Sequence, residues 1–243
     1  MKKIILSVKR DGFRGDQPDP TSGLAEFKLV KKDVLERDLH QCQFCDFHAP
    51  KYQEVHHLDD DHENNDPENL ITSCVLCHMC FHIGFAGLKN RGVLIFLDEG
   101  KSIPNFQARL NNLVRVLWLC TYSINKKVAM QATDYLKRLE SLRIPASDYL
   151  GTSDPVFLAN YLRELGDTDY QKRDEKLDGI YLLPLREGYP SHIQYWKQKD
   201  NAKVIESISE ISKMNSLEWI GVNGKNQDMS GLKEFLLEND AIF

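Results

Sequence analysis

The sequence predicts an α+β fold in three parts: a compact zinc-binding region over residues 1–100, a helical region packed on it over 101–195, and a helical C-terminal extension over 196–243. Most of the Cys and His residues gather between positions 41 and 87, which is typical of a metal site. After that segment, apolar residues recur at spacings of three and four, the period of an amphipathic helix. Short apolar runs bounded by Gly, Pro or Asp predict a few strands beside the helices.

The composition is typical of a soluble globular protein. The 243 residues include 31 Lys and Arg and 36 Asp and Glu, a net charge of −5, and 42% of them are hydrophobic. No apolar run reaches the ~18 residues that a bilayer span needs. The short apolar run near the N-terminus is followed by Lys9 before it attains the length of a signal peptide. We therefore expect a cytoplasmic protein with reduced cysteines and no membrane span.

Outside the Cys- and His-rich segment, the first hundred residues are expected to hold two strands, a loop and a helix. Residues 3–8 are predicted as a strand, and 11–23, rich in Gly and Pro, as a loop. A helix is expected at about 26–38. The apolar run GVLIFL at 92–97, followed by charged residues and Gly, predicts a buried strand.

The helical region is expected to begin near Asn105, which would cap its first helix. One face of that helix is apolar and consists of Phe106, Leu110, Leu113, Val114, Leu117 and Trp118. A second helix is expected at about 127–142. Residues 181–185 should be extended, because Pro184 disfavours helix at the residue before it.

A third helix is defined at both ends by its sequence. Asp154 would be its N-cap, Pro155 its first residue, and Gly166 lies just past its end. Its apolar face would contain Phe157, Leu158, Tyr161, Leu162 and Leu165. In the C-terminal extension, short amphipathic helices are expected at 202–215 and 230–238.

Two CxxC pairs form the clearest metal motif, and they consist of Cys42, Cys45, Cys74 and Cys77. The pairs are separated by 28 residues. Four thiolates at this spacing complete the closed tetrahedral shell of a structural zinc, and such a site would help a small region to fold. The alternative is four buried, reduced thiols without a metal. Of the other two cysteines, Cys120 is expected in the core, and Cys80 has no clear assignment.

The residues around the two pairs resemble a nuclease motif. The resemblance rests on VLERDLHQCQFC, EVHHL, PENL and SCVLCH, all within about residues 34–85. These segments are similar to the zinc-ribbon, or treble-clef, form of the HNH endonuclease motif. The resemblance implies a ββα-metal fold, in which a β-hairpin is followed by a helix.

The same resemblance assigns roles to five polar residues. His56, His78 and His82 would hold one divalent ion, such as Mg, Mn or Ni, with the last two one turn apart on the same helix. His57 would be the general base that activates water, and Asn69 would steady the loop that orients His57. The ion would stabilise the charge of the phosphorane and of the leaving oxygen. Together these residues would nick nucleic acid.

The charge of the motif argues against such catalysis. Residues 41–100 contain 3 basic and 10 acidic residues, a charge of −7, whereas 101–150 contain 8 and 3, a charge of +5. Nucleases usually bring Lys and Arg to the phosphates, so the basic segment would have to fold over the histidines. Three aspartates at 59–61 occupy a loop that is usually rich in small residues in this motif. Cys80, between the two helical histidines, could divert a thiophilic metal.

A second resemblance covers more of the chain, about residues 30–196. It rests on CQFCDFHAPKYQ, the Asn-rich loop, CVLCHMCF, GVLIFL, GTSDP and LLPLR, which resemble the IcmJ/DotN family of type IVB secretion systems. The resemblance implies a noncatalytic, HNH-like zinc scaffold in a cytoplasmic subunit of the coupling complex, recruited to the inner membrane through the secretion complex. Its implied partners are the C-terminal tail of the coupling ATPase and other subunits of that complex.

Three functions are open on this basis. The preferred one is the coupling-complex subunit, and the alternative is an active, metal-dependent HNH endonuclease that nicks DNA. A nucleic-acid-binding zinc module without chemistry is disfavoured by the acidic motif. Aromatic residues of the helical region could line a groove for a partner peptide, although most are expected in the core: Trp118, Tyr122, Tyr135, Phe157, Tyr161 and Trp196.

Overall fold

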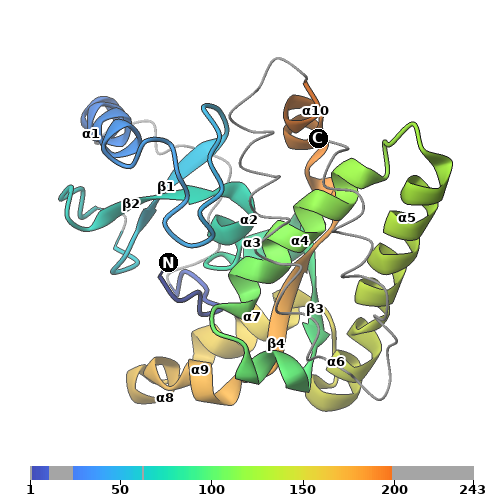
Figure 1. Cartoon of the computed structure of the whole chain (residues 1–243). Helices are drawn as coiled ribbons and strands as arrows, with labels where there is room; N and C mark the ends of the chain where they lie inside the picture. Colours follow the sequence, from blue (N-terminus) through green and yellow to red (C-terminus); the bar gives the residue numbers. More distant parts are fainter. Residues whose placement is uncertain (1, 11–23, 62, 199–243) are drawn as a thin grey trace.

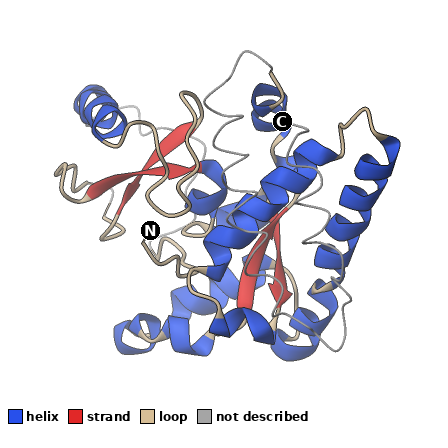
Figure 2. Cartoon of the chain, viewed as in Figure 1, coloured by secondary structure: helices blue, strands red, loops and turns tan. Residues whose placement is uncertain are grey.

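Two small antiparallel sheets, each of two strands, organise the part of the chain that the structure describes (Figure 1). The computed structural model describes residues 2–10, 24–61 and 63–198. Helices outnumber strands, and they surround the second sheet, as Figure 2 shows. This mixture of helices and small sheets is the α+β class that the sequence predicts.

The first sheet is a β-hairpin followed by a helix. It pairs β1 (Gln53–His57) with β2 (Leu70–Cys74), antiparallel and in register along their whole length. The chain passes from β2 directly into α2 (Val75–Met79). α1 (Leu24–Arg37) covers one side of the hairpin. The small core between α1 and the hairpin is formed by Val34, Val55 and Leu70.

The second sheet joins distant parts of the chain. It pairs β3 (Gly92–Phe96) with β4 (Ile180–Pro184), again antiparallel. α6 (Arg143–Leu150) packs on β3, and α4 (Phe106–Cys120) packs on β4. β3 comes from the expected zinc-binding region and β4 from the expected helical region. The two strands of this sheet therefore lie on opposite sides of the boundary expected at residue 100.

α4 is the central helix of the described structure. It crosses the middle of the molecule (Figure 1) and contacts α2, β4, α5 (Lys126–Ser141) and α10 (Pro190–Trp196). Of its 15 residues, 14 are buried, including the whole predicted apolar face. The buried set also contains polar side chains, and these need partners inside the protein because an unpaired buried polar group is costly. They are Gln107, Asn111, Asn112 and Arg115.

The remaining described elements are short: α3 (Ile83–Leu88), η1 (Asp98–Ser102), α7 (Pro155–Glu164), α8 (Asp167–Gln171), α9 (Arg173–Lys176) and η2 (Arg186–Gly188). α7 begins as predicted, because the side chain of Asp154 accepts a hydrogen bond from the backbone N–H of Val156 at 2.8 Å and Pro155 is the first helical residue. The helices expected at 26–38 and 127–142 are confirmed as α1 and α5. The extended segments expected at 92–97 and 181–185 are confirmed as β3 and β4.

The strand expected at 3–8 is wrong. The segment is extended but belongs to no strand, and it lies against the turn between α2 and α3. The backbone N–H of Ser7 donates to the carbonyl of Cys80 at 2.9 Å, and the N–H of Ile83 donates to the carbonyl of Ser7 at 3.1 Å. A turn offers isolated hydrogen bonds and no ladder, so a strand cannot form there.

Two details of the helices also differ from expectation. Asn105 precedes α4 with a φ of 54°, and its side chain makes no capping hydrogen bond. On α7, Phe157 and Tyr161 are 62% and 48% exposed, whereas Leu158 and Leu162 are buried. The predicted apolar face was too wide, because only one of its two i, i+4 stripes faces the core. The loop expected at 11–23 and the helices expected at 202–215 and 230–238 lie outside the described residues.

Candidate metal centre

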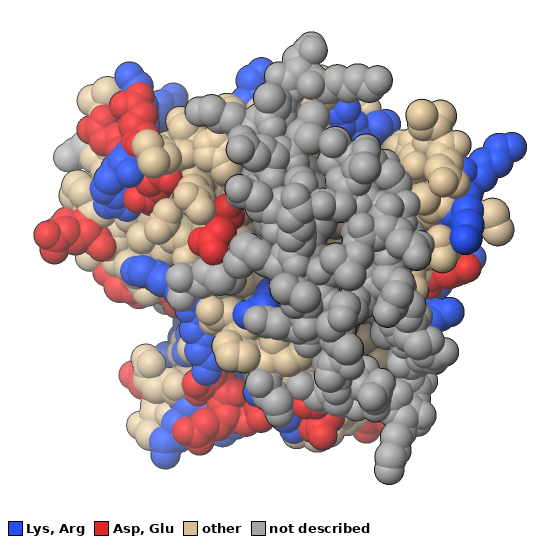
Figure 3. Space-filling view, in the orientation of Figure 1, with Lys and Arg blue, Asp and Glu red and all other residues tan. Residues whose placement is uncertain are grey.

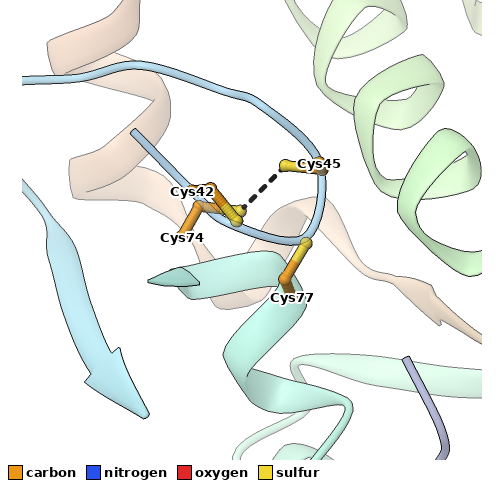
Figure 4. Close-up of side chains that lie close together, drawn as sticks. All are labelled: Cys42, Cys45, Cys74 and Cys77. Atoms are coloured by element: carbon orange, nitrogen blue, oxygen red, sulfur yellow. Dashed lines mark hydrogen bonds between the residues drawn. The ribbon is translucent and has the colours of Figure 1, made fainter. Parts of the chain in front are cut away.

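The four cysteines of the two CxxC pairs converge on one point (Figure 4). Their sulfur atoms all lie within 4.8 Å of one another, and all four side chains are buried. Among residues 2–10, 24–61 and 63–198, this is the only group of three or more His, Cys, Asp or Glu side chains whose ligand atoms lie so close together. It is the set that the CxxC spacing predicts: Cys42, Cys45, Cys74 and Cys77.

Two local turns hold these sulfurs in place. Cys42 and Cys45 lie in a tight turn, in which the backbone N–H of Asp46 donates to the carbonyl of Cys42 at 2.9 Å. Asp46 has a φ of 62°, the left-handed conformation that Asp tolerates better than most residues. Cys74 is the last residue of β2 and Cys77 lies in α2. Each pair is therefore positioned by the backbone next to it.

The geometry of the cluster fits a tetrahedral metal ion. The sulfur atoms of Cys45 and Cys74, joined by the dashed line in Figure 4, are 3.7 Å apart. A disulfide would require about 2.05 Å, whereas a tetrahedron built on Zn–S bonds of about 2.3 Å has an edge of about 3.8 Å. A complete shell of four sulfurs leaves no open coordination position, which is typical of structural sites. The four cysteines could therefore bind a metal such as zinc.

α4 brings polar side chains to the sulfurs. Arg115 is buried, and its Nη2 donates to the sulfur of Cys74 at 3.2 Å. Asn111 is also buried, and its Nδ2 donates to the sulfur of Cys77 at 3.4 Å. Nitrogen donors favour the thiolate form of cysteine, which is the form that binds metal. These partners come from a helix more than 30 residues away in sequence, and the CxxC motifs themselves give no indication of them.

Burial and mutual contact shift the pKa values of the thiols in opposite directions. Burial is the largest influence on Cys45 and Cys77, and it raises the pKa of both thiols well above the ordinary value. Burial also acts to raise the pKa of Cys74, but hydrogen bonds from the other three thiols and the charge of Arg115 outweigh it. The pKa of Cys74 is therefore well below its ordinary value. The thiol that ionises most readily is thus the one in contact with Arg115.

The other two cysteines do not belong to the cluster. Asn111 Nδ2 is 3.8 Å from the sulfur of Cys80, but the Cys80 thiol donates to the carbonyl of Leu76. Burial raises the pKa of Cys80, so this thiol keeps its proton. Cys120 lies in the core, as expected, and burial raises the pKa of Cys120 to about 12.

Three of the histidines singled out in the sequence lie side by side. The ring centroids of His56 and His78 are 5.5 Å apart, and those of His78 and His82 are 4.8 Å apart. All three rings are buried, and Phe81 stacks on His56 at 4.0 Å. The expected common helix is wrong, because α2 ends at Met79 and His82 occupies the N-cap position of α3. The rings are neighbours, but their nitrogen atoms are not gathered as closely as the sulfurs.

His57 lies on the other face of the hairpin, and Asn69 lies at the end of the loop that joins β1 to β2. Successive residues of a strand point to opposite faces, so His57 faces α1, where its ring stacks on Phe27 at 5.6 Å. His57 Nε2 is 3.3 Å from Asn65 Oδ1. Asn69 steadies the loop after β1: its Nδ2 donates to the carboxylate of Asp59 at 2.8 Å, and the N–H of Asp59 donates to Asn69 Oδ1 at 3.1 Å.

Glu54 is a residue of the histidine site that the motif did not single out. Its carboxylate contacts His78 Nδ1. Glu54 precedes His56 by two residues on β1, so the two side chains project from the same face of the strand. That period-two spacing is the sequence feature that could have identified it. The carboxylate adds a negative charge beside the buried rings.

The surroundings of the histidines are acidic, whereas a cation lies beside the cysteines. Burial raises the pKa of Asp60, and the charge of Arg173 only partly opposes this. Figure 3 shows acidic side chains, interspersed with Lys and Arg, along the edge that carries α1 and the hairpin. The exposed ones in the loop after β1 are Asp59, Asp61, Glu63, Asp66 and Glu68. Arg115 of the basic segment 101–150 is buried, but it contacts the cysteine cluster and not the histidines.

Fold and site together define an α+β protein with a buried cluster of four cysteines that could bind a metal. A scan against protein-family models finds no match. Over 187 residues the chain is 31% identical to the type 4 apparatus protein DotN of Legionella pneumophila (strain Philadelphia 1), a match that covers 76% of this chain and 83% of DotN. The chain belongs to the DotN family. None of the helices described combines the length and the apolar character needed to cross a membrane.

Proposed function

We propose that this protein is a cytoplasmic subunit of a type IVB secretion or conjugation coupling complex, built on an HNH-like scaffold that a structural zinc stabilises. The observation that carries the proposal is the match to DotN of Legionella, a type 4 apparatus protein, over most of both chains. The subunit would be recruited to the inner membrane through the complex. Its role would be to bind the coupling ATPase.

Zinc is the ion that the donor set favours. Four thiolates at tetrahedral spacing suit zinc, and no oxygen ligand that would favour Mg or Ca is among them. Such an ion would tie the turn that carries Cys42 to the junction of β2 and α2, and so stabilise a hairpin that has only a small core of its own. Elemental analysis of the purified protein should give one zinc per chain. A metal-free, fully folded protein would contradict this part of the proposal.

The order β1, β2, α2 supports the HNH-like scaffold, and the contacts of the histidines support a role without chemistry. Glu54 contacts His78, and its carboxylate adds negative charge beside the rings. The acidic loop after β1 would repel a phosphodiester. The scaffold would therefore serve to present the surface of the helical region to a partner.

The partner surface that we propose lies on α7 and α3. Of the six aromatic residues noted in the helical region, Trp118, Tyr135 and Trp196 are buried and Tyr122, Phe157 and Tyr161 are exposed. Phe157 and Tyr161 are one turn apart on α7, and exposed Leu88 lies on α3, which packs closely on α7. Exposed aromatic residues at this spacing are typical anchors for a peptide. The proposed ligand is the C-terminal tail of the coupling ATPase.

Binding of the purified protein to a synthetic tail of the ATPase tests this proposal. The wild type should bind at micromolar concentration, and the double variant Phe157→Ala/Tyr161→Ala should bind about tenfold more weakly, because truncated anchor residues cost more than 1 kcal/mol. Ile144→Ala, at an exposed position on α6, is the matched control and should bind like the wild type. Absence of binding by the wild type would overturn the adaptor role. Equal binding by all variants would show that the tail binds to another surface, and the adaptor role itself would stand.

An active, metal-dependent HNH endonuclease is the second candidate, because three histidine rings lie within 5.5 Å of a neighbour and Asn69 braces the loop next to His57. It would use His56, His78 and His82 to hold Mg, Mn or Ni and His57 as general base. Supercoiled plasmid should then be nicked by the wild type and not by His57→Ala at equal zinc content. If the plasmid remains intact with each of the three metals, the endonuclease function is overturned and the scaffold role remains.

A further inference from the structure

Arg115 is the fully buried cation of the described structure, with 0% of its surface exposed. It lies on α4, which is covered on all sides by other elements. Placing a guanidinium in such an environment is unfavourable unless opposite charge or strong acceptors compensate for the lost water. The residue therefore needs an explanation that apolar packing alone does not give.

No Asp or Glu pairs with Arg115 among the described residues. Its partners are a cysteine sulfur, an amide oxygen and two aromatic rings. Nη2 donates to the sulfur of Cys74 at 3.2 Å, and Nη1 donates to Oδ1 of Asn112 at 2.5 Å. The guanidinium carbon lies 3.7 Å from the ring centroid of Phe47 and 5.1 Å from that of Trp196. The anionic partner of this cation is thus the sulfur cluster.

The neighbouring residue Asn112 reaches the same site by a second route. Its Nδ2 donates to the carbonyl of Cys45 at 2.8 Å, while its Oδ1 accepts from Arg115. Asn111 donates to the sulfur of Cys77. α4 therefore contacts three of the four cysteines through three polar residues that lie within one turn and a half of the helix. A helix that begins about 30 residues after the last ligand completes the surroundings of a site whose ligands all lie between residues 42 and 77.

We propose that Arg115 is the counter-charge of the metal site and that it couples metal binding to the packing of α4. Four thiolates and one divalent ion leave an excess of negative charge, which a buried guanidinium offsets. The inference rests on the metal site proposed above. A role in packing alone is the competing explanation, because the long side chain of Arg115 also fills space between Phe47 and Trp196.

Arg115→Met separates the two explanations, since Met has a similar shape and no charge. Arg115→Lys retains the charge without the planar fork. Arg109→Met is the matched control: it removes an arginine from the same helix, at a position where Nε bonds the carbonyl of Pro104, away from the sulfurs. Zinc affinity of the full-length protein is measured by competition with a chromogenic chelator, and thermal stability is measured with zinc and after its removal.

The counter-charge role predicts that Arg115→Met lowers the affinity for zinc by about tenfold or more, the usual effect of removing a partner of metal ligands. Arg115→Lys should lose less, and Arg109→Met should match the wild type. Without metal, Arg115→Met should lose much less stability than it loses with zinc bound, because Met fills a similar space and the missing charge matters most beside the metal-bound sulfurs. If Arg115→Met fails to fold, Arg115→Gln, which keeps a polar side chain and removes the charge, takes its place, and its affinity relative to Arg109→Met decides.

Unchanged zinc affinity in Arg115→Met would overturn the proposal. So would an equal loss of stability with and without zinc, which is the result expected of a packing role. If Arg115→Met does not fold, an affinity of Arg115→Gln equal to that of Arg109→Met would overturn it as well, because Gln carries no charge. A wild type that binds no zinc would instead remove the metal site itself, and the two failures are therefore distinguishable.

Discussion

The cysteine cluster and the histidine cluster lie beside the same hairpin, but they are assembled in different ways. The four sulfurs are held by two backbone turns and lie within 4.8 Å of one another. The three histidine rings come from β1, from α2 and from the turn beyond α2, and their neighbouring centroids are 4.8 and 5.5 Å apart. A cluster built from two local segments forms once these two segments lie side by side. A cluster built from three separate elements depends on how all three pack.

The charges around the two clusters differ in sign. Arg115 donates to a sulfur of the cysteine cluster, where metal binding would leave negative charge. Glu54 contacts His78, and Asp60 is partly buried nearby. An acidic surrounding suits a cation and opposes a phosphate. Among the described residues, a cation thus contacts the cysteine cluster, whereas carboxylates lie beside the histidine cluster.

Removal of one cysteine is the change with the largest expected effect. Cys42→Ser should abolish zinc binding and destabilise the protein by several kcal/mol, because a structural zinc contributes on the order of 10 kcal/mol to the fold that it holds. Zinc content and thermal unfolding measure this. Cys120→Ser is the control, since Cys120 is equally buried on α4 but lies outside the cluster. A Cys42→Ser protein that is stable and soluble without zinc would show that the cluster is not a structural centre.

The sequence predicts the cysteine cluster and the four longest helices described, α1, α4, α5 and α7, for the same physical reason. The CxxC spacing and the capping of α7 by Asp154 depend on hydrogen bonds within a few residues, and such relations are visible in a short stretch of sequence. The partners of the sulfurs on α4 and the contact between Glu54 and His78 depend on tertiary packing. The same holds for residues 3–8, whose partner is a turn between two helices. The sequence therefore indicated the ligands and not their surroundings.

Asp38 links the end of α1 to β2 of the hairpin. Its carboxylate accepts the backbone N–H of Thr72 at 2.8 Å and contacts Arg37 at the end of α1. Asp38→Asn should cost about 2 kcal/mol at neutral pH, because it removes the charge from these hydrogen bonds. Zinc content should not change. Denaturant unfolding at several pH values measures the effect.

The pH dependence of this variant has a definite direction. Burial acts to raise the pKa of Asp38, but hydrogen bonds from Arg37 and Thr72 outweigh it, and the pKa of Asp38 is below its ordinary value. The stability that the ionised group provides is therefore present above the unfolded pKa of about 3.9 and is lost as the pH falls through the lower, folded value. The difference between wild type and Asp38→Asn should shrink as the pH falls below about 4. A difference that is constant from pH 7 to pH 3 would contradict this role.

Asn69 tests whether the loop beside His57 is braced independently of the metal. Its Nδ2 donates to Asp59 and to the carbonyl of Asn64, and its Oδ1 accepts from the N–H of Asp59. Asn69→Ala should destabilise the protein by only about 1 kcal/mol, because the loop is largely exposed to water. Amide exchange in residues 59–64 should accelerate. Asn65→Ala, which removes one contact with His57, is the control and should leave that exchange nearly unchanged.

Glu54→Gln should have the smallest effect on stability and sharpen the comparison most. The change keeps a hydrogen-bond acceptor beside His78 and removes the charge, so the cost should be less than about 1 kcal/mol at a partly exposed position. The zinc of the cysteines should remain at one per chain. If the two clusters are independent, uptake of Mn or Ni beyond that zinc should change in Glu54→Gln and remain unchanged in Arg115→Met. Loss of zinc from Glu54→Gln would show instead that the two clusters form one site.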